Sequence, residues 1–297
     1  MRKSIKVFYE ESKLREISII MKAIVFGATK SAMAMYTEIS KKYDIVAYCD
    51  NDQNKWGSEI NDVKVIAPKL IPTVNYDEII IASLSAMDVI RKQLLDMGID
   101  ECKINTSYVE FRVRAREFFV RDFAKLVYQR GLQGSVAEGG VFQGEFATII
   151  NECFSDRKLY LFDTFEGFDE RDVILESLNG FSEAKPGYLN ITSEELVLRK
   201  MKYVDKCVIK KGYFPETTEG IEDTFCFVNL DMDLYKPTIE GLRFFYPRMV
   251  KGGIIVVHDY FSVGYEGVNA AIEEFCREYP VIPFPIGDTV SIAFQKN

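Results

Sequence analysis

The sequence is poor in the residues that build metal centres and disulfide frameworks. It contains a single histidine, His258, and its six cysteines are scattered without a C-x-x-C pair. This usage argues against a zinc site and against a disulfide-stabilised secreted domain. We therefore predict ordinary thiols and a cytoplasmic location.

Long apolar runs and a positive net charge are also lacking. No run approaches the roughly 20 apolar residues that a membrane span requires, and the charged N-terminus has no apolar core of signal-peptide length. The net charge of -8 disfavours a nucleic-acid phosphate backbone as a partner. The sequence therefore predicts neither a membrane nor a nucleic acid among its partners.

What the 297 residues do contain is two successive series of strand and helix patterns. Such alternation predicts two α/β domains with mostly parallel sheets. We expect an N-terminal arm or helix over 1–20, a small Rossmann-like domain over 21–105, a bridging helix over 106–134 and a doubly wound domain over 135–297. The apolar face of the bridging helix is compatible with pairing between two copies, so a homo-oligomer is one option.

Two apolar runs in the second series each end in acidic residues. Asp231 and Asp233 follow one run, and the pair His258 and Asp259 follows the next. In an open α/β sheet ligands bind at the carboxyl ends of the strands. We therefore expect these side chains to converge, with a metal ion as one occupant. Asp233 is also compatible with capping the helix that begins near Tyr235.

A glycine-containing turn, 138–144, follows the first strand of the second series. Glycines at 140 and 144 would let a ligand approach the backbone, and the helix that follows offers free N–H groups. Asp163 ends the next strand, at the place where an acid accepts hydrogen bonds from ribose hydroxyls. The G-x-G-x-x-G fingerprint is missing, which favours a single nucleoside over a dinucleotide.

Five motifs occur in order along the second series, at 137–144, 161–168, 211–217, 230–235 and 258–260. They resemble those of the macrocin O-methyltransferases (TylF/MycF type), which are class I enzymes that use S-adenosylmethionine. The resemblance covers residues 107–297 and implies the seven-stranded methyltransferase sheet. It also implies methyl transfer to a hydroxyl of a sugar or glycosylated metabolite, in polysaccharide or secondary-metabolite assembly.

The resemblance also implies roles for individual residues. Asp231 and Asp259 would hold a divalent ion, usually magnesium, and Asp231 and His258 are the catalytic candidates. His258 stands where the family has an aspartate, and imidazole is a poor partner for magnesium, so the identity of the metal and the need for one stay open. The residues expected to contact the cofactor are Glu138, Gly139, Gly140, Phe142, Gly144, Asp163 and Thr164.

The first series leaves several alternatives open. Gly27 occupies the position of a phosphate-binding turn, and Asp50 ends the second strand. This domain would bind a nucleotide-sugar or serve as a scaffold. An NAD(P)-linked sugar-nucleotide oxidoreductase and a non-enzymatic nucleotide-binding protein are the rival functions. In the second series, the polar insertion over 167–202 is a candidate lid that would select the acceptor.

Overall fold

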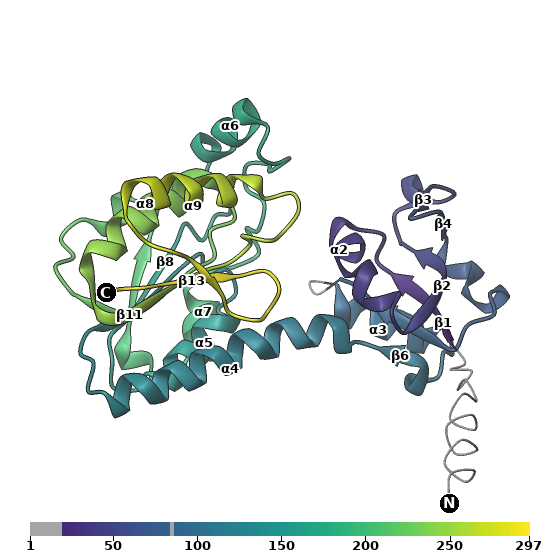
Figure 1. Cartoon of the computed structure of the whole chain (residues 1–297), viewed down its shortest axis with the longest axis horizontal. Helices are drawn as coiled ribbons and strands as arrows, with labels where there is room; N and C mark the ends of the chain where they lie inside the picture. The colour runs from purple at the N-terminus through teal and green to yellow at the C-terminus, as the bar shows by residue number, and fades with distance from the viewer. Residues whose placement is uncertain (1–19, 84–85) are drawn as a thin grey trace, which may run out of the picture. The chain divides into compact units, whose positions relative to one another are not determined.

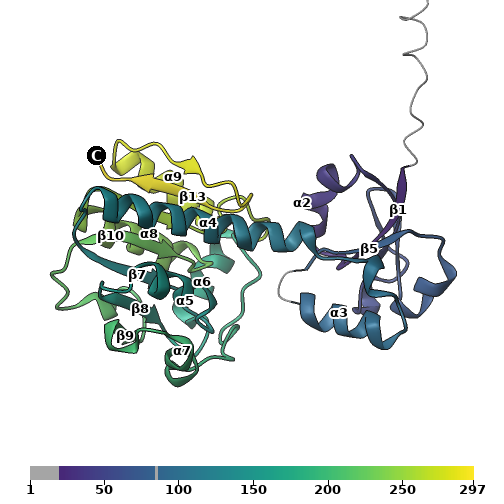
Figure 2. The same cartoon turned by 90° about the horizontal axis from the view of Figure 1, so that it is seen from below.

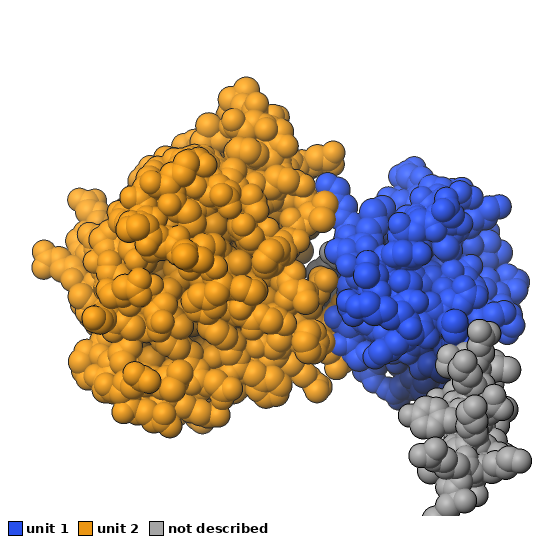
Figure 3. Space-filling model, viewed as in Figure 1, with its two compact units in different colours: residues 1–108 blue, residues 109–297 orange. Residues whose placement is uncertain are grey.

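The computed structural model describes residues 20–83 and 86–297, so nearly all of the arm or helix expected over 1–20 lies outside the described residues. The chain folds as two compact units, 1–108 and 109–297, which are coloured separately in Figure 3. Each unit is built around a sheet of its own (Figure 1). The predicted α/β class with two mostly parallel sheets is confirmed.

In the described residues, unit 1 contains one sheet, the helices α2 and α3, and short 3-10 turns. Its main elements are β1 (Met21–Phe26), α2 (Lys30–Ile39), β2 (Tyr43–Cys49), β3 (Glu59–Ile60), β4 (Val63–Ile66), β5 (Glu78–Ile81), α3 (Met87–Asp96) and β6 (Ile104–Asn105). The strands lie in the order β3-β4-β2-β1-β5-β6, and only the β3–β4 pair is antiparallel. The chain returns to the other side of β1 at β5, so the topological switch of this sheet lies between β1 and β5.

Unit 2 consists of a larger sheet with helices on both faces. Its main elements are α4 (Ser107–Gln129), β7 (Ser135–Gly139), α5 (Glu145–Cys153), β8 (Leu159–Asp163), α6 (Glu170–Asn179), α7 (Glu194–Lys200), β9 (Cys207–Lys211), β10 (Phe225–Leu230), α8 (Tyr235–Phe245), β11 (Met249–Val257), α9 (Glu266–Glu278), β12 (Phe284–Pro285) and β13 (Ile292–Gln295). The strand order is β12-β13-β11-β10-β7-β8-β9. This is the predicted seven-stranded sheet, and its topological switch lies between β7 and β10.

Two apolar clusters hold the layers of unit 2 together. On one face, α8 and α9 pack on the sheet through buried side chains such as Leu242 and Ile272. On the other face, α4, α5 and α7 contribute residues such as Val127, Ile150 and Val197 (Figure 2). Burial on both faces explains why β10 is a continuous apolar run rather than an alternating one.

The helix expected to bridge the domains is α4, and its apolar residues are divided between two environments. Phe123 and Val127 are buried in the core of unit 2, whereas Phe111, Phe118 and Leu126 are exposed. The buried set accounts for the packing of α4 against the sheet. Pairing between two copies of the chain stays a prediction for the exposed set.

The segment expected to form a lid, 167–202, is not a polar insertion throughout. It contains α6, whose N-cap is Asp169, and α7, whose N-cap is Ser193. Val197 on α7 is fully buried in the core beneath the sheet. Val197 thus anchors α7 to the core, and the role of the segment as a lid stays a prediction.

Two observations complete the fold. All six cysteines are free thiols. Among the described helices, none combines the length and the apolar character needed to cross a membrane.

Candidate active site

Three strand ends meet at the carboxyl edge of the unit 2 sheet. The last residue of β10, Leu230, is in register with Gly139 on β7 and Val257 on β11. The backbone N–H of Asp231 donates to the Gly139 carbonyl at 2.8 Å, and that of His258 donates to the Leu230 carbonyl at 2.9 Å. These bonds bring the residues after the strands together at the topological switch, where α/β sheets bind ligands.

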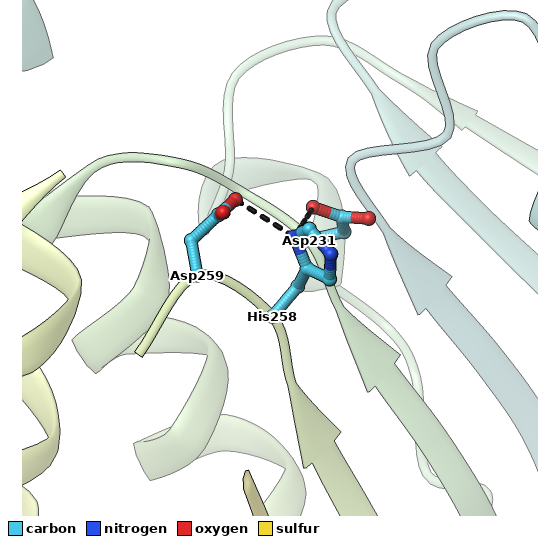
Figure 4. A group of neighbouring side chains, drawn as sticks. All are labelled: Asp231, His258 and Asp259. Atoms are coloured by element: carbon cyan, nitrogen blue, oxygen red, sulfur yellow. Dashed lines mark hydrogen bonds and ion pairs between the residues drawn. The ribbon is translucent and has the colours of Figure 1, made fainter. Parts of the chain in front are cut away.

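His258 joins the two acids that the sequence predicts at this edge. Its Nδ1 lies 3.1 Å from Oδ1 of Asp231 and 2.8 Å from Oδ2 of Asp259 (Figure 4). The hydroxyl of Ser262 donates to Oδ1 of Asp259 at 2.5 Å. One imidazole nitrogen therefore bridges two carboxylates that come from separate strand ends.

A cation from α4 holds the other side of Asp231. Nη1 of Arg116 donates to Oδ2 of Asp231 at 2.8 Å, and the same guanidinium lies over the ring of Phe146, 4.1 Å from its centroid. The pair is largely buried, with 17% of the Arg116 side chain and 22% of the Asp231 side chain exposed. Shielding from water strengthens such a pair, so Arg116 fixes the position of this carboxylate.

The charges in this cluster depend on one another. Burial alone would lower the pKa of His258, but Asp231 and Asp259 outweigh it and raise that pKa to about 10. Burial would raise the pKa of Asp231, but His258 and Arg116 hold it well below its ordinary value. His258 likewise lowers the pKa of Asp259 against the effect of burial. The two carboxylates thus favour the imidazolium form of His258, the form in which this residue cannot take up a further proton.

Asp233 does not cap α8, so that expectation is wrong. The first free N–H group of the helix, on Tyr235, donates instead to Oε1 of Glu176 on α6 at 2.7 Å. Asp233 has a left-handed backbone with φ of 60°. Burial, followed by the charge of Asp259, raises the pKa of the Asp233 carboxyl well above its ordinary value. Burial and the neighbouring Asp259, with which Asp233 shares a hydrogen bond, therefore favour the protonated form of Asp233.

A buried polar pair lies beside the cluster. Glu138 on β7 and Asn229 on β10 are opposite each other in the sheet, and Nδ2 of Asn229 donates to Oε1 of Glu138 at 2.9 Å. Oε2 of Glu138 and Oδ1 of Asn229 are buried and have no hydrogen-bond partner in the described part of the chain. Burial, followed by the charge of Asp231, raises the pKa of Glu138 well above its ordinary value. Unpaired buried oxygens are costly, so this pair is suited to accept N–H groups from a ligand.

Two glycines of the 138–144 turn are required by packing. A Cβ at Gly140 would lie 1.9 Å from the carbonyl oxygen of Asp231, and a Cβ at Gly144 would lie 3.0 Å from Val197. The packing of the protein therefore accounts for glycine at both positions, and contacts of this turn with a cofactor stay a prediction. Gly140 and Gly144 also have φ of 80° and 84°, where other residues are strained.

Asp163 shapes the same turn from the next strand. Its Oδ2 accepts the N–H groups of Val141 and Phe142, both at 2.8 Å, and its Oδ1 accepts the N–H of Phe165 at 2.7 Å. The hydroxyl of Thr164 donates to a carbonyl oxygen three residues along the chain at 2.7 Å. The structure thus gives Asp163 and Thr164 roles in loop geometry, and their contacts with a ribose stay a prediction.

These residues fit S-adenosylmethionine better than magnesium. The unpaired oxygens of Glu138 and Asn229 match a ligand that carries an ammonium group. Asp231, His258 and Asp259 offer ligand atoms within 4.8 Å of one another, but one donor is a nitrogen, and magnesium prefers oxygen. The carboxylate oxygens of Asp231 and Asp259 are also already engaged by His258, Arg116 and Ser262.

Three residues of this edge are not identified by reasoning from the sequence. Asn229 leaves a faint signal, because it is a polar residue within the apolar run of β10. Arg116 leaves none, because α4 carries several arginines and only the tertiary structure selects one. Glu176 caps a helix from 59 positions away in sequence, and a contact between such distant residues has no local pattern.

Comparisons with known proteins agree with the motifs. Residues 19–105 match the family model described as C2185-like, N-terminal. The chain is 26% identical over 145 residues to the 8-demethyl-8-(2,3-dimethoxy-alpha-L-rhamnosyl)-tetracenomycin-C 4'-O-methyltransferase of Streptomyces olivaceus, with 44% of this chain and 54% of the relative covered. It is 27% identical over 143 residues to the mycinamicin III 3''-O-methyltransferase of Micromonospora griseorubida, with 44% and 56% covered. The chain thus spans little more than half the length of these relatives.

The solved structures give the same result for the fold. The structure of the O-methyltransferase NovP superposes with a TM-score of 0.50 at 21% identity, over 62% of this chain and 80% of NovP. At this identity the likeness establishes the fold alone. The sequence relatives and this shared fold together confirm the resemblance to O-methyltransferases that the motifs predict.

Proposed function

We propose that the chain is an S-adenosylmethionine-dependent O-methyltransferase whose acceptor is a hydroxyl of a sugar or glycosylated small molecule. One observation carries the proposal. At the switch point of a methyltransferase sheet, the unpaired oxygens of Glu138 and Asn229 lie beside the charged cluster of Asp231, His258 and Asp259. Relatives that methylate glycosylated compounds, according to their names, support the acceptor class.

Glu138 and Asn229 form the binding end of the proposed site. Burial raises the pKa of the Glu138 carboxyl, and a cationic ligand beside its Oε2 would favour the ionised form. Asn229 holds Oε1 of Glu138 in place, which directs Oε2 toward the ligand. Asp163 keeps the adjoining turn in shape through its backbone hydrogen bonds.

The charged cluster forms the reacting end. S-adenosylmethionine supplies an electrophilic methyl group on a sulfonium, which an oxygen nucleophile can take. The acceptor hydroxyl must lose its proton as its oxygen bonds to carbon, and the cations His258 and Arg116 favour that loss by lowering the pKa of a nearby hydroxyl. Asp231 is the candidate to accept the hydrogen bond that orients the hydroxyl, and the released proton passes to water. His258 is assigned as a cation that stabilises charge instead of as a base.

The divalent ion implied for Asp231 and Asp259 stays a prediction and has no part in these steps. It is also separable from the transferase function. A transferase that needs no metal would bind the same cofactor at Glu138 and would methylate the same acceptor.

Incubation of the full chain with S-adenosylmethionine and a panel of sugar nucleotides and glycosides tests the proposal. We expect a product that has gained one methyl group, detected by mass spectrometry, together with S-adenosylhomocysteine. The Asp231→Asn variant is the control for background methylation. A chain that binds neither S-adenosylmethionine nor S-adenosylhomocysteine in calorimetry would end the proposal.

A further inference from the structure

Every carboxylate oxygen of Asp231 and Asp259 already has a donor from the chain. Oδ1 of Asp231 and Oδ2 of Asp259 share Nδ1 of His258, at 3.1 and 2.8 Å. Oδ2 of Asp231 accepts from Arg116 at 2.8 Å, and Oδ1 of Asp259 accepts from the hydroxyl of Ser262 at 2.5 Å. These are the oxygens that a divalent ion would need.

Two basic side chains stand where the ion would bind. The carboxylates of Asp231 and Asp259 face the guanidinium of Arg116 and the imidazole ring of His258. A divalent cation at these oxygens would have to displace one of these two side chains.

Arg116 cannot move away from Asp231 without losing favourable contacts. Its guanidinium lies 4.1 Å from the centroid of the Phe146 ring, and only 17% of its side chain is exposed. Leaving Asp231 would give up both the ion pair and the contact with the ring. The arrangement is thus held from two directions, by α5 and by the strand ends.

We propose that this site works without a divalent metal ion, because Nδ1 of His258 and the guanidinium of Arg116 occupy the carboxylate oxygens that the ion would bind. The inference rests on the proposed function, and it assigns the two cations different tasks. Arg116 is a positioning residue that fixes Asp231. His258 supplies the bridge between Asp231 and Asp259.

Calorimetric titration of the full chain, after treatment with a chelator, tests the inference directly. Magnesium, manganese and zinc chlorides are the probes. We expect no saturable binding of any of the three ions at the cluster. Binding of one equivalent of any of them to the wild-type chain, abolished in Asp231→Asn, would overturn the inference.

A substitution at His258 tests whether this residue is what keeps a divalent ion out of the cluster. His258→Asp supplies a third carboxylate and removes the bridging imidazole, so we expect it to bind magnesium or manganese at least about tenfold more tightly than the wild-type chain. His258→Asn is the matched control, because asparagine has the size of aspartate but no charge, and it should gain much less metal affinity. If His258→Asp gains no metal affinity, His258 is not what excludes the ion, and the inference is wrong.

Binding of S-adenosylhomocysteine shows whether each variant is folded and separates the two proposals. If a variant does not fold, the titration of the wild-type chain decides the question alone. If the wild-type chain binds no S-adenosylhomocysteine, the proposed function fails, while the metal titrations still give their own answer. If it transfers methyl groups only when a divalent ion is added back after chelation, the function stands and the metal-free inference falls.

Discussion

The two units share the same arrangement of a strand, a glycine turn and a facing acid. In each, the first strand runs into a turn with a glycine at positive φ, Gly27 in unit 1 and Gly140 in unit 2. In each, the acid that follows or ends the second strand accepts a backbone N–H group of that turn. Asp50 accepts from the N–H of Ala28 at 2.8 Å, and Asp163 accepts from the N–H of Val141 at 2.8 Å.

The units differ in what lies next to this arrangement. In unit 1 the Asp50 carboxylate is engaged from several sides, since it also accepts from the backbone of Asp52 at 2.8 Å and from Lys55 at 2.9 Å. In unit 2, one buried oxygen of Glu138 and one of Asn229 have no hydrogen-bond partner among the described residues. The glycine turn and its facing acid therefore have the same structural role in both units, which is to lead the chain out of a parallel strand. The neighbouring pair of buried oxygens without hydrogen-bond partners is the feature that indicates a ligand site in unit 2.

The largest effect is expected when a methyl group is added to the turn of each unit. Gly140→Ala places Cβ 1.9 Å from a backbone oxygen at φ of 80°, whereas for Gly27→Ala, at φ of 108°, the nearest atom of the described residues lies 3.4 Å from Cβ. We expect Gly140→Ala to reduce the free energy of unfolding by about 3 to 5 kcal/mol and Gly27→Ala by about 1 to 2 kcal/mol. Thermal unfolding followed by circular dichroism measures both.

The single tryptophan, Trp56, lies in unit 1 and tells the units apart. Gly27→Ala should move the transition seen by Trp56 fluorescence, and Gly140→Ala should leave it in place. If Gly140→Ala moves the fluorescence transition as far as the circular dichroism transition, the two units do not unfold independently and the comparison between them loses its basis.

The second effect concerns turnover. Asp231→Asn removes the charge that Arg116 and His258 face, so we expect turnover to fall about 100-fold or more, with little change in cofactor affinity. Asp50→Asn is the matched substitution in unit 1 and should leave turnover unchanged. Methyl transfer to the best acceptor, measured by mass spectrometry, compares the two variants; equal losses would contradict the assignment of the chemistry to unit 2.

The third effect concerns the cofactor. Glu138→Ala removes the carboxyl whose Oε2 is free to accept a ligand, and the loss of one charged hydrogen bond weakens binding about 10- to 100-fold. Calorimetry with S-adenosylhomocysteine measures the change. Glu138→Gln keeps the shape and one acceptor and should lose less affinity; an alanine variant that binds as tightly as the wild type would remove Glu138 from the site.

Much of this arrangement could be predicted from the sequence, because strand ends and glycine turns leave local patterns. The runs that end at Asp231 and Asp259 predict their meeting, since parallel strands bring their carboxyl ends to one edge. The reason for Gly140 could not be predicted, because the atom it avoids belongs to Asp231. The roles of Arg116 and Glu176 also depend on contacts that only the folded chain creates, and the capping role expected for Asp233 failed for the same reason.

The smallest effect is a dependence of stability on pH that belongs to unit 2. Burial raises the pKa of Asp172 from 3.8 to about 6, and Tyr213 donates to its Oδ1 at 2.8 Å. An acid whose pKa is raised by folding contributes its full stabilisation below the pKa that it has in the unfolded chain. That contribution to the unfolding free energy is lost as pH rises through the folded-state pKa of about 6. Relative to Asp172→Asn, the wild type should therefore lose roughly 1 to 2 kcal/mol of unfolding free energy between about pH 4 and pH 7.

Chemical denaturation at a series of pH values gives this difference. The Trp56 transition, which reports unit 1, should show no difference between the wild type and Asp172→Asn. A difference that does not vary with pH would mean that Asp172 is ionised in the folded chain.

The most direct test of the central claim is a calorimetric titration of the full chain with S-adenosylhomocysteine, because the claim is that unit 2 binds the cofactor at Glu138 whereas the similar turn of unit 1 does not bind it. We predict one equivalent bound by the wild type and by Asp50→Asn with equal affinity, and clearly weaker binding by Glu138→Ala. Binding that is lost in Asp50→Asn and kept in Glu138→Ala, or no binding by the wild type, would contradict the claim.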